Sequence, residues 1–279
     1  MADNTISSSF VKQFEADVHL VYQRMGSKLT NMVRRKNSVK GESTTFQVVG
    51  KGEAQQKGRN SDVPILNLNH SAVECTLADY YAGEFIDKLD ELKVEHDERQ
   101  VAAQSIAAAM GRKSDAILVA AMDGGGYSGA SQQTSSSGGV TQAKVEEIYE
   151  HMGNEDVPDD GQRMLGVAPQ GWTDLMGVTS FSDRDYVLES ELPFRGGAGS
   201  LKKWFSFVVF TFSGWTKNSA VRSSYAWHKS SFGFASGQEV QMDITWQGLK
   251  QAHLCVGSLS QGACIIDLTG AYELRATES

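Results

Sequence analysis

The stretch "VEHDERQVAAQSIAAAMGRKSDAILVAAM", residues 94–122, consists almost wholly of residues that favour an α-helix. At 1.5 Å per residue it forms a rod of about 43 Å, which is longer than most helices of globular proteins. Five apolar residues share one side of this rod: Ala103, Ile106, Met110, Ile117 and Ala121. We therefore expect a long helix that lies across a sheet.

Strand patterns follow this helix along the chain. In "EVQMDITWQ", residues 239–247, apolar and polar residues alternate strictly, which predicts a strand with one buried face. The segments "ACIIDL" and "AYELRA" predict two closing strands around Thr269 and Gly270. A shorter helix is expected around Ile148, ending at Gly153. Together these elements predict an α+β fold.

A long hairpin is expected before the helix. The strand-like "TTFQVVG", residues 44–50, and a second run at 63–68 flank a polar tip that contains several glycines. The tip, residues 51–62, has almost no apolar residue to anchor it. We therefore expect its order to depend on a neighbouring molecule.

The first sixty residues are basic, with ten Lys/Arg against five Asp/Glu, whereas the remainder carries 16 against 29. Arg34, Arg35 and Lys36 stand together in this part. Such a run could lie on phosphates, on an acidic protein surface, or simply in water. Before it, apolar residues recur at three- and four-residue steps between Val11 and Met25, which predicts an amphipathic N-terminal arm.

Composition excludes several classes of protein. The chain has 279 residues and no run of eighteen apolar residues, and its first ten residues lack the apolar core of a signal peptide, so we expect no membrane segment. The three cysteines form no CxxC pair, which argues against a disulfide framework or a zinc knuckle and predicts buried thiols.

The glycine- and serine-rich stretch after the long helix, "DGGGYSGASQQTSSSGG" at 123–139, could be a phosphate loop, a linker or a hinge. A phosphate loop needs a Lys-Ser/Thr pair that is missing here, and "GGYSGA" lacks the final glycine and the preceding strand of a nucleophile elbow. The six histidines show no metal-ligand spacing, and Pro158 interrupts the acidic cluster at 155–160. We therefore predict no catalytic residue, no cofactor and no metal, and favour a building block over an enzyme.

Four segments, in the same order, resemble the major capsid proteins of tailed double-stranded DNA bacteriophages with the Hong Kong 97-type fold. "EFIDKLDELKVEHDERQVAAQSIAAAMGRKSDAILVAAM" resembles their spine helix and its Asp-rich approach. "VPDDGQRMLGVAPQGWTDLM" resembles a segment with an arginine, a short strand, a proline and a short helix. "GGAGSLKKWFSFVVFTFSGW" resembles the strand pair that follows, and "GACIIDLTGAYELRA" the closing strands. One departure is that Trp204 and Phe205 stand where the family often has a glycine.

The resemblance implies a domain organisation. It implies an N-terminal arm at 1–40, an extended loop at 41–72, a peripheral domain with spine helix and hinge at 73–139, an axial domain at 140–235, and a peripheral strand returning to the axial domain at 236–279. The glycine- and serine-rich stretch then becomes a hinge between domains. The expected hinge residues are Gly124, Gly125, Gly126, Gly129, Gly138 and Gly139.

The resemblance also implies function and partners. The chain is expected to self-assemble through hexamers and pentamers into an icosahedral phage head, built in the host cytoplasm, that encloses double-stranded DNA. A separate scaffolding protein and a portal are expected partners, with a decoration protein as a further possible one. Non-specific DNA contact on the inner face is assigned to Arg34, Arg35 and Lys36. Contact between subunits is assigned to the extended loop, at Phe46, Val48, Lys51, Lys57, Arg59 and Ile65.

Two other readings of the sequence stay open at this point. An encapsulin-like compartment would share the fold but enclose cargo protein. A serine hydrolase would need Ser128 activated by a histidine.

Overall fold

The computed structural model describes residues 26–91, 97–127, 132–182 and 202–278. These residues fall into two compact units. The smaller unit is built on Tyr80–Arg112 and Val240–Leu259. The larger unit is built on Ser27–Asp79, Lys113–Glu239 and Ser260–Ser279. The predicted N-terminal arm helix, the glycine at 129 and Ser128 lie outside the described residues.

Both helices and strands occur, as the α+β prediction required. The helices are α1 (Lys88–Glu91), α2 (Glu98–Asp123), α3 (Gln142–Asn154), α4 (Pro169–Met176) and α5 (Thr179–Ser182). The strands are β1 (Arg34–Lys36), β2 (Ser43–Val49), β3 (His70–Thr76), β4 (Ala78–Asp87), β5 (Arg163–Val167), β6 (Lys202–Trp204), β7 (Phe207–Thr211), β8 (Lys217–Asn218), β9 (Val221–His228), β10 (Phe232–Gln247), β11 (Ala252–Ile265) and β12 (Ala271–Thr277).

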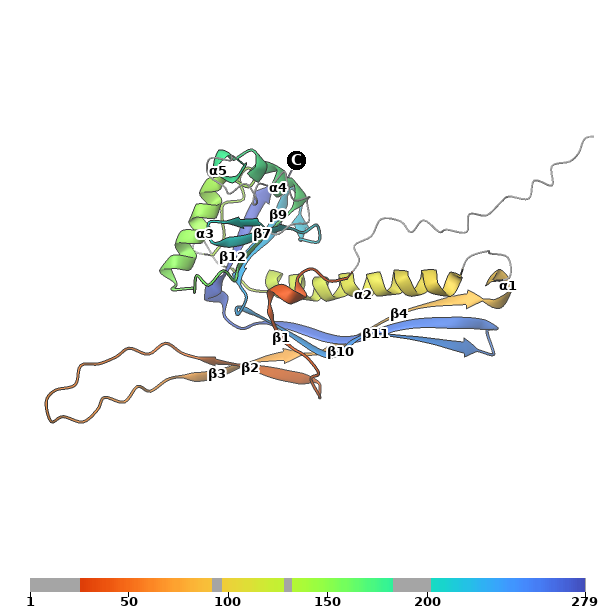
Figure 1. Cartoon of the computed structure of the whole chain (residues 1–279), viewed down its shortest axis with the longest axis horizontal. Helices are drawn as coiled ribbons and strands as arrows, with labels where there is room; N and C mark the ends of the chain where they lie inside the picture. The colour runs from red at the N-terminus through yellow and green to blue at the C-terminus, as the bar shows by residue number, and fades with distance from the viewer. Residues whose placement is uncertain (1–25, 92–96, 128–131, 183–201, 279) are drawn as a thin grey trace, which may run out of the picture. The chain divides into compact units, whose positions relative to one another are not determined.

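The larger unit is organised around a mixed sheet with the strand order β12-β9-β5-β7-β6, to which β8 adds by pairing with β9. Strand β5 pairs parallel with β7 and antiparallel with β9. Helices α3 and α4 lie over one face of this sheet (Figure 1). Pro169 occupies the start of α4, where its fixed φ suits a helix and its missing N–H costs nothing.

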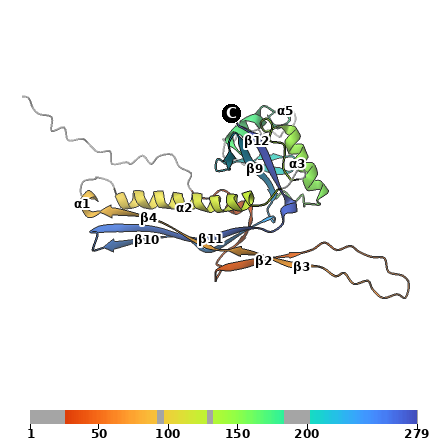
Figure 2. The same ribbon diagram turned by 180° about the vertical axis from the view of Figure 1, so that it is seen from behind.

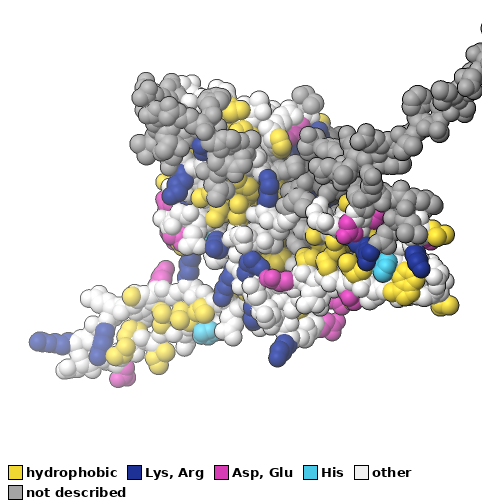
Figure 3. All heavy atoms as spheres, turned by 45° about the vertical axis from the view of Figure 1, so that its right-hand side comes forward, with side chains coloured by type: hydrophobic (Ala, Val, Ile, Leu, Met, Phe, Trp, Pro, Cys, Tyr) yellow, Lys and Arg dark blue, Asp and Glu magenta, His cyan; other side chains and the backbone are white. Residues whose placement is uncertain are grey.

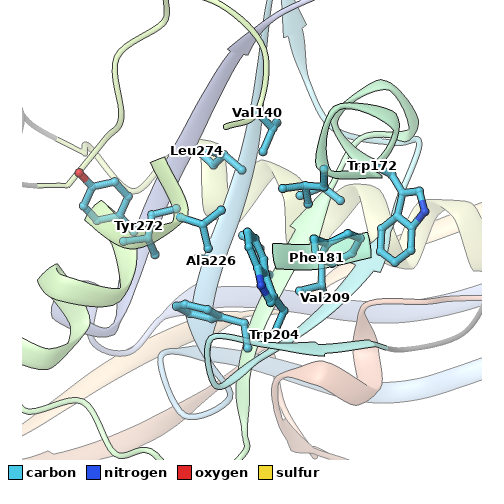
Figure 4. Packing of buried hydrophobic residues seen from close by; sticks show 14 of the residues in the cluster. Val140, Trp172, Phe181, Trp204, Val209, Ala226, Tyr272 and Leu274 are labelled. Atoms are coloured by element: carbon cyan, nitrogen blue, oxygen red, sulfur yellow. The ribbon is translucent and has the colours of Figure 1, made fainter. Parts of the chain in front are cut away.

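The face under α3 and α4 holds one apolar cluster. Ile148 and Met152 of α3 and Trp172 of α4 pack on sheet residues that include Leu165 and Tyr272. Figure 4 shows part of this packing, with the ring of Phe181 between Trp172 and Trp204. The ring centroids of these two pairs are 5.4 and 5.1 Å apart, with edge-on geometry that favours aromatic pairs.

The opposite face of the same sheet is also buried. Leu118 and Met122, from the second half of α2, form a cluster there with Phe210 and Trp227. Successive strand residues point to opposite faces, so Val209 joins the first cluster and Phe210 the second. A strand that is buried on both faces reads as a continuous apolar run, which explains "FSFVVFTF" at 205–212.

A tight hairpin is found at Trp204 and Phe205, where the sequence departs from the expected family pattern. Strands β6 and β7 pair antiparallel with Trp204 opposite Phe207. The two turn residues, Phe205 and Ser206, both have positive φ, at 47° and 63°. A two-residue turn needs such values to match the twist of its strands, and here non-glycine residues adopt them.

The smaller unit packs the first half of α2 on strands β4 and β11, which lie beside each other in the order β1-β10-β11-β4 (Figure 2). Ile106 and Met110 are buried against Ile86, Cys255 and Leu259. Helix α2 starts at Glu98 because the Asp97 carboxylate accepts the backbone N–H of Arg99 at 3.1 Å. The long helix is thus confirmed, although its buried side changes between its halves because each half packs on a different cluster.

The strand predicted at 239–247 is present as the second half of β10, but the prediction that one of its faces is buried was wrong. Four apolar residues alternate along it and are all exposed: Val240 39%, Met242 36%, Ile244 46% and Trp246 44%. This half of β10 is paired on one side only, by β11, because β1 pairs with the start of β10. Helix α2 packs on residues of β4 and β11. The alternation therefore marks an apolar edge strand that the described residues of this chain leave uncovered.

Strands β2 and β3 form the predicted hairpin and pair from Ser43 opposite Thr76 to Val49 opposite His70. The second strand is seven residues later than the run at 63–68 that we expected. Those residues have no paired strand opposite them, because the partner positions fall in the polar tip. Residues 50–69 instead form a loop along which hydrophobic side chains are visible on the surface (Figure 3).

Candidate interaction surfaces

The acidic loop at 155–160 is held by hydrogen bonds to its neighbours in the sequence and to Ser206. Asp159 accepts from the Ser206 hydroxyl at 2.8 Å, and Asp160 accepts from the backbone N–H of Gln162 at 2.9 Å. That backbone hydrogen bond is the main reason why the pKa of Asp160 is lowered. The guanidinium of Arg163 donates to the backbone carbonyls of Val157 and Pro158. In the described part of the chain no group of His, Cys, Asp and Glu could hold a metal ion.

The basic run forms β1, which pairs parallel with the start of β10. Its three side chains are exposed and, with Thr45 and Phe46 of β2, line an open cavity of about 320 Å³. They differ in their contacts. Arg35 donates to Asn31 at 3.1 Å and to Glu239 at 3.3 Å, so a carboxylate already offsets its charge.

Within the described residues, neither Arg34 nor Lys36 forms such an ion pair. The Arg34 guanidinium lies 5.7 Å from the centroid of the Phe46 ring, and Lys36 donates to the carbonyl of Thr45 at 3.4 Å. An aromatic face and a backbone carbonyl leave the positive charge of a side chain uncancelled. Arg34 and Lys36 therefore remain the candidates for binding an anion, and Arg35 is a weaker one.

The loop between β2 and β3 presents a second surface. Ile65 is 83% exposed and Val63 69%, and with Leu66 they line an open hollow of about 410 Å³. Lys57 and Arg59 are also exposed, while Lys51 forms an exposed ion pair with Asp156 at 3.4 Å. Such exposed pairs contribute little to stability.

Phe46 does not belong to this surface. It is 3% exposed and packs with Cys75 and Ala235 of its own chain, so it is unavailable to another subunit. Its place on β2 explains the difference, because Thr44 and Phe46 point inward while Thr45 and Gln47 point outward. Val48, farther along β2, is only half-buried.

The second half of the glycine- and serine-rich stretch is tied to β12. The backbone N–H of Thr134 donates to the carbonyl of Glu273, and its hydroxyl donates to the carbonyl of Arg275 and accepts from the N–H of Arg275. The carbonyl of Gly138 accepts from the backbone N–H of Thr277 at 2.8 Å. The buried Lys144 ammonium also donates to Gly138, at 3.4 Å, and to Ser137 at 3.0 Å. Burial lowers the pKa of Lys144.

These contacts reduce the number of glycines that can act as a hinge. The whole described part of the stretch belongs to the larger unit, and the two compact units divide within α2, at Arg112 and Lys113. A Cβ on Gly139 would lie 2.3 Å from a carboxylate oxygen of Asp174, so this glycine provides close packing. Gly124, Gly125 and Gly126 make none of these contacts with β12 but lie in the larger unit as well, so the hinge stays a proposal that the division into units does not support.

A buried carboxylate that the sequence did not reveal fixes the start of the larger unit. Asp115 of α2 is fully buried and accepts from the Ser27 hydroxyl at 2.6 Å. It also accepts from the backbone N–H groups of Lys28 and Leu29, at 3.1 and 3.0 Å. The signal for it was an aspartate in a helix directly before the apolar run that begins at Ala116, which on its own does not say what the carboxylate binds.

A family model for phage capsid proteins matches residues 6–278 of the chain. The chain belongs to the phage capsid protein family. It is a structural major capsid protein, which forms the shell of a phage virion together with copies of itself. A search of curated protein sequences gives no match to this capsid protein.

Solved structures show its fold. The capsid of cyanophage P-SCSP1u matches with a TM-score of 0.74 at 15% identity, over 97% of this chain and 94% of that chain. A structure from Mycobacterium phage Che8 matches with a TM-score of 0.74 at 13% identity, over 98% of each chain. The capsid of Ralstonia phage GP4 gives 0.73 at 10% identity, over 100% of this chain and 98% of that chain.

These likenesses confirm the Hong Kong 97-type fold that the four sequence segments predicted. In the described part of the capsid protein, no helix combines the length and the apolar character needed to span a bilayer.

Proposed function

We propose that this capsid protein assembles through hexamers and pentamers into an icosahedral head that encloses double-stranded DNA. The observation that carries the proposal is the exposed apolar surface, on the loop at Val63, Ile65 and Leu66 and on β10 at Ile244 and Trp246. Burying apolar area of this kind stabilises by roughly 25 cal/mol per Å², so association with further copies is favoured.

The proposal includes a domain organisation and partners. The N-terminal arm is residues 1–40, the extended loop 41–72, the peripheral domain with spine helix and hinge 73–139, and the axial domain 140–235, while residues 236–279 form a peripheral strand that returns to the axial domain. A separate scaffolding protein, a portal and a decoration protein are proposed partners, assembly takes place in the host cytoplasm, and the chain has no catalytic role.

Electron microscopy of the purified chain, alone and with a co-expressed scaffolding protein, tests the assembly. Closed shells, or rings of five and six subunits, are the expected result. Particles that stay monomeric in both preparations, at concentrations well above those in an infected cell, contradict it.

The contact with packaged DNA is proposed for Arg34 and Lys36, with Arg35 contributing less because of Glu239. Each phosphate contact releases counterions, so binding of duplex DNA to assembled shells should weaken with salt. Arg34→Glu together with Lys36→Glu should reduce genome retention more than Arg35→Glu alone. Lys203→Glu, an exposed change on β6, matches the charge change of Arg35→Glu and is its control. Equal retention in all these particles argues against the assignment.

A further inference from the structure

Two cysteines meet in the larger unit, at the place where the β2–β3 hairpin joins strand β11. Cys75 lies near the end of β3 and is 1% exposed, whereas Cys264 in β11 is half-buried. They share one apolar cluster with Phe46 and Ala235. The expectation of three fully buried thiols therefore holds for Cys75 and Cys255 but not for Cys264.

The two thiols form a hydrogen bond with each other. Two glycines leave room around the sulfurs. A Cβ on Gly233 would lie 3.0 Å from the Sγ of Cys264, and one on Gly262 would lie 3.4 Å from the Sγ of Cys75. Because neither glycine has a side chain, nothing at these two positions crowds the sulfurs, which a disulfide would bring to an S–S distance of about 2.05 Å.

We propose that Cys75 and Cys264 are a disulfide-forming pair that fastens the β2–β3 hairpin to strand β11 when the protein meets an oxidant. Both thiols are free in the present structure, which is the reduced form. Cys255 is buried in the smaller unit, in the cluster of Ile106 and Leu259, and takes no part.

The oxidant is a low-molecular-weight disulfide, R–S–S–R. Cys75, whose pKa is lowered, first loses its proton to water. The half-buried Cys264 then passes its own proton to the Cys75 thiolate, and the Cys264 thiolate so formed attacks R–S–S–R, giving a mixed disulfide and releasing R–S⁻. This R–S⁻ takes up the proton that Cys75 loses again before the second step. The sulfur of Cys75 then attacks the sulfur of Cys264, the bond to R breaks, and a second R–S⁻ leaves. The two protons of the cysteines end on two R–SH, so the chain loses the two electrons and two protons that the oxidant gains.

The hydrogen bond supports this chemistry. The Cys264 thiol donates to Cys75 and lowers the pKa of Cys75, while the pKa of Cys264 is raised because that thiol holds the shared proton. Cys75 is therefore the sulfur of the pair that ionises first, and the thiolate is the reactive form. A neighbouring thiol stands ready to resolve the mixed disulfide.

A reducing cell interior keeps such a pair as thiols, and an oxidising medium outside allows the bond. If the chain assembles in the host cytoplasm, a step that rests on the proposed function, the bond forms after the particle is released. Each subunit then holds its extended loop covalently to its sheet without any change in the contacts between subunits.

The test uses the full-length, unassembled chain, so it does not depend on shell formation. The chain is reduced, freed of reductant, and incubated with excess glutathione disulfide; remaining thiols are alkylated in denaturant and counted by mass spectrometry. We expect three thiols before oxidation, one after it, and a tryptic peptide that links Cys75 to Cys264. Because the bond closes a loop of about 190 residues, the midpoint of thermal unfolding should rise by about 5 to 15 °C.

Variants separate the pair from the third cysteine. Cys255→Ser should fall from two thiols to none and show the same rise of the midpoint. Cys75→Ser and Cys264→Ser should each keep two thiols and show no rise. Three remaining thiols in the oxidised wild-type chain, a link that involves Cys255, or a link between two chains overturns the proposal, even if a variant of the pair fails to fold.

Discussion

At the scale of single residues, the buried carboxylate of Asp115 depends on hydrogen-bond donors that the folded chain supplies. It accepts the hydroxyl of Ser27 and two backbone N–H groups in a site without exposure to water. Asp115→Asn keeps the shape but removes the charge and turns an NH₂ group toward those donors. We expect a loss of about 1 to 3 kcal/mol in the free energy of unfolding, measured in urea. The exposed Asp243→Asn is the control and should change it by less than about 0.5 kcal/mol.

A second prediction at this scale concerns backbone conformation. Ser219 is exposed in the turn between β8 and β9 and has a φ of +58°, a value that costs a non-glycine residue about 1 kcal/mol. Ser219→Gly removes that strain but frees the unfolded chain, so we expect a net gain of up to about 1 kcal/mol in urea unfolding. Ser213→Gly, at an exposed position without positive φ, should instead destabilise. Destabilisation by both changes to the same extent would show that the turn at Ser219 is not strained.

At the scale of elements, the loop between β2 and β3 should change its accessibility on assembly. Lys57 and Arg59 are exposed in the chain by itself, and so are the apolar residues around Ile65 that we assign to a neighbouring subunit. Trypsin should therefore cut at Lys51, Lys57 and Arg59 readily in free subunits and at least tenfold more slowly in shells. Ile65→Asp should restore fast cutting in any shells that still form. Equal rates in free and assembled wild-type protein would remove the loop from the interface between subunits.

The elements also show how far a sequence predicts this structure. The helix at 94–122 and the strand at 239–247 were predictable because their patterns are local. The position of β3 was not predictable, because pairing with β2 determines it. The apolar run at 63–68 has the composition of a strand but is not one. For the same reason Phe46 was assigned to a surface although it is buried: only the strand register tells inside from outside. The contacts of Arg35 with Glu239 and of Asp115 with residues 27–29 join distant parts of the chain, so no local pattern reveals them.

At the scale of the whole molecule, the apolar residues of β10 should matter for assembly and not for folding. Ile244 is 46% exposed in the single chain, so Ile244→Asp should leave its thermal unfolding within about 2 °C of the wild type. In the shell the same carboxylate would be desolvated, and the yield of assembled particles should fall at least tenfold in size-exclusion chromatography. Thr245→Asp places the charge on the other face of the strand and serves as the control. Normal shells from Ile244→Asp would mean that this face stays in contact with water.

Strand β10 changes character along its length: its first five residues are all buried and its last nine are all exposed. In evolutionary terms, two kinds of selection act on one strand. Substitutions at 232–236 must suit the chain's own interior, so they should be few and conservative. Substitutions at 239–247 must suit whatever covers them, so among related phages they should vary freely but change together with the residues of that covering surface. Aligned genomes would then reveal the partner of this edge from paired changes alone.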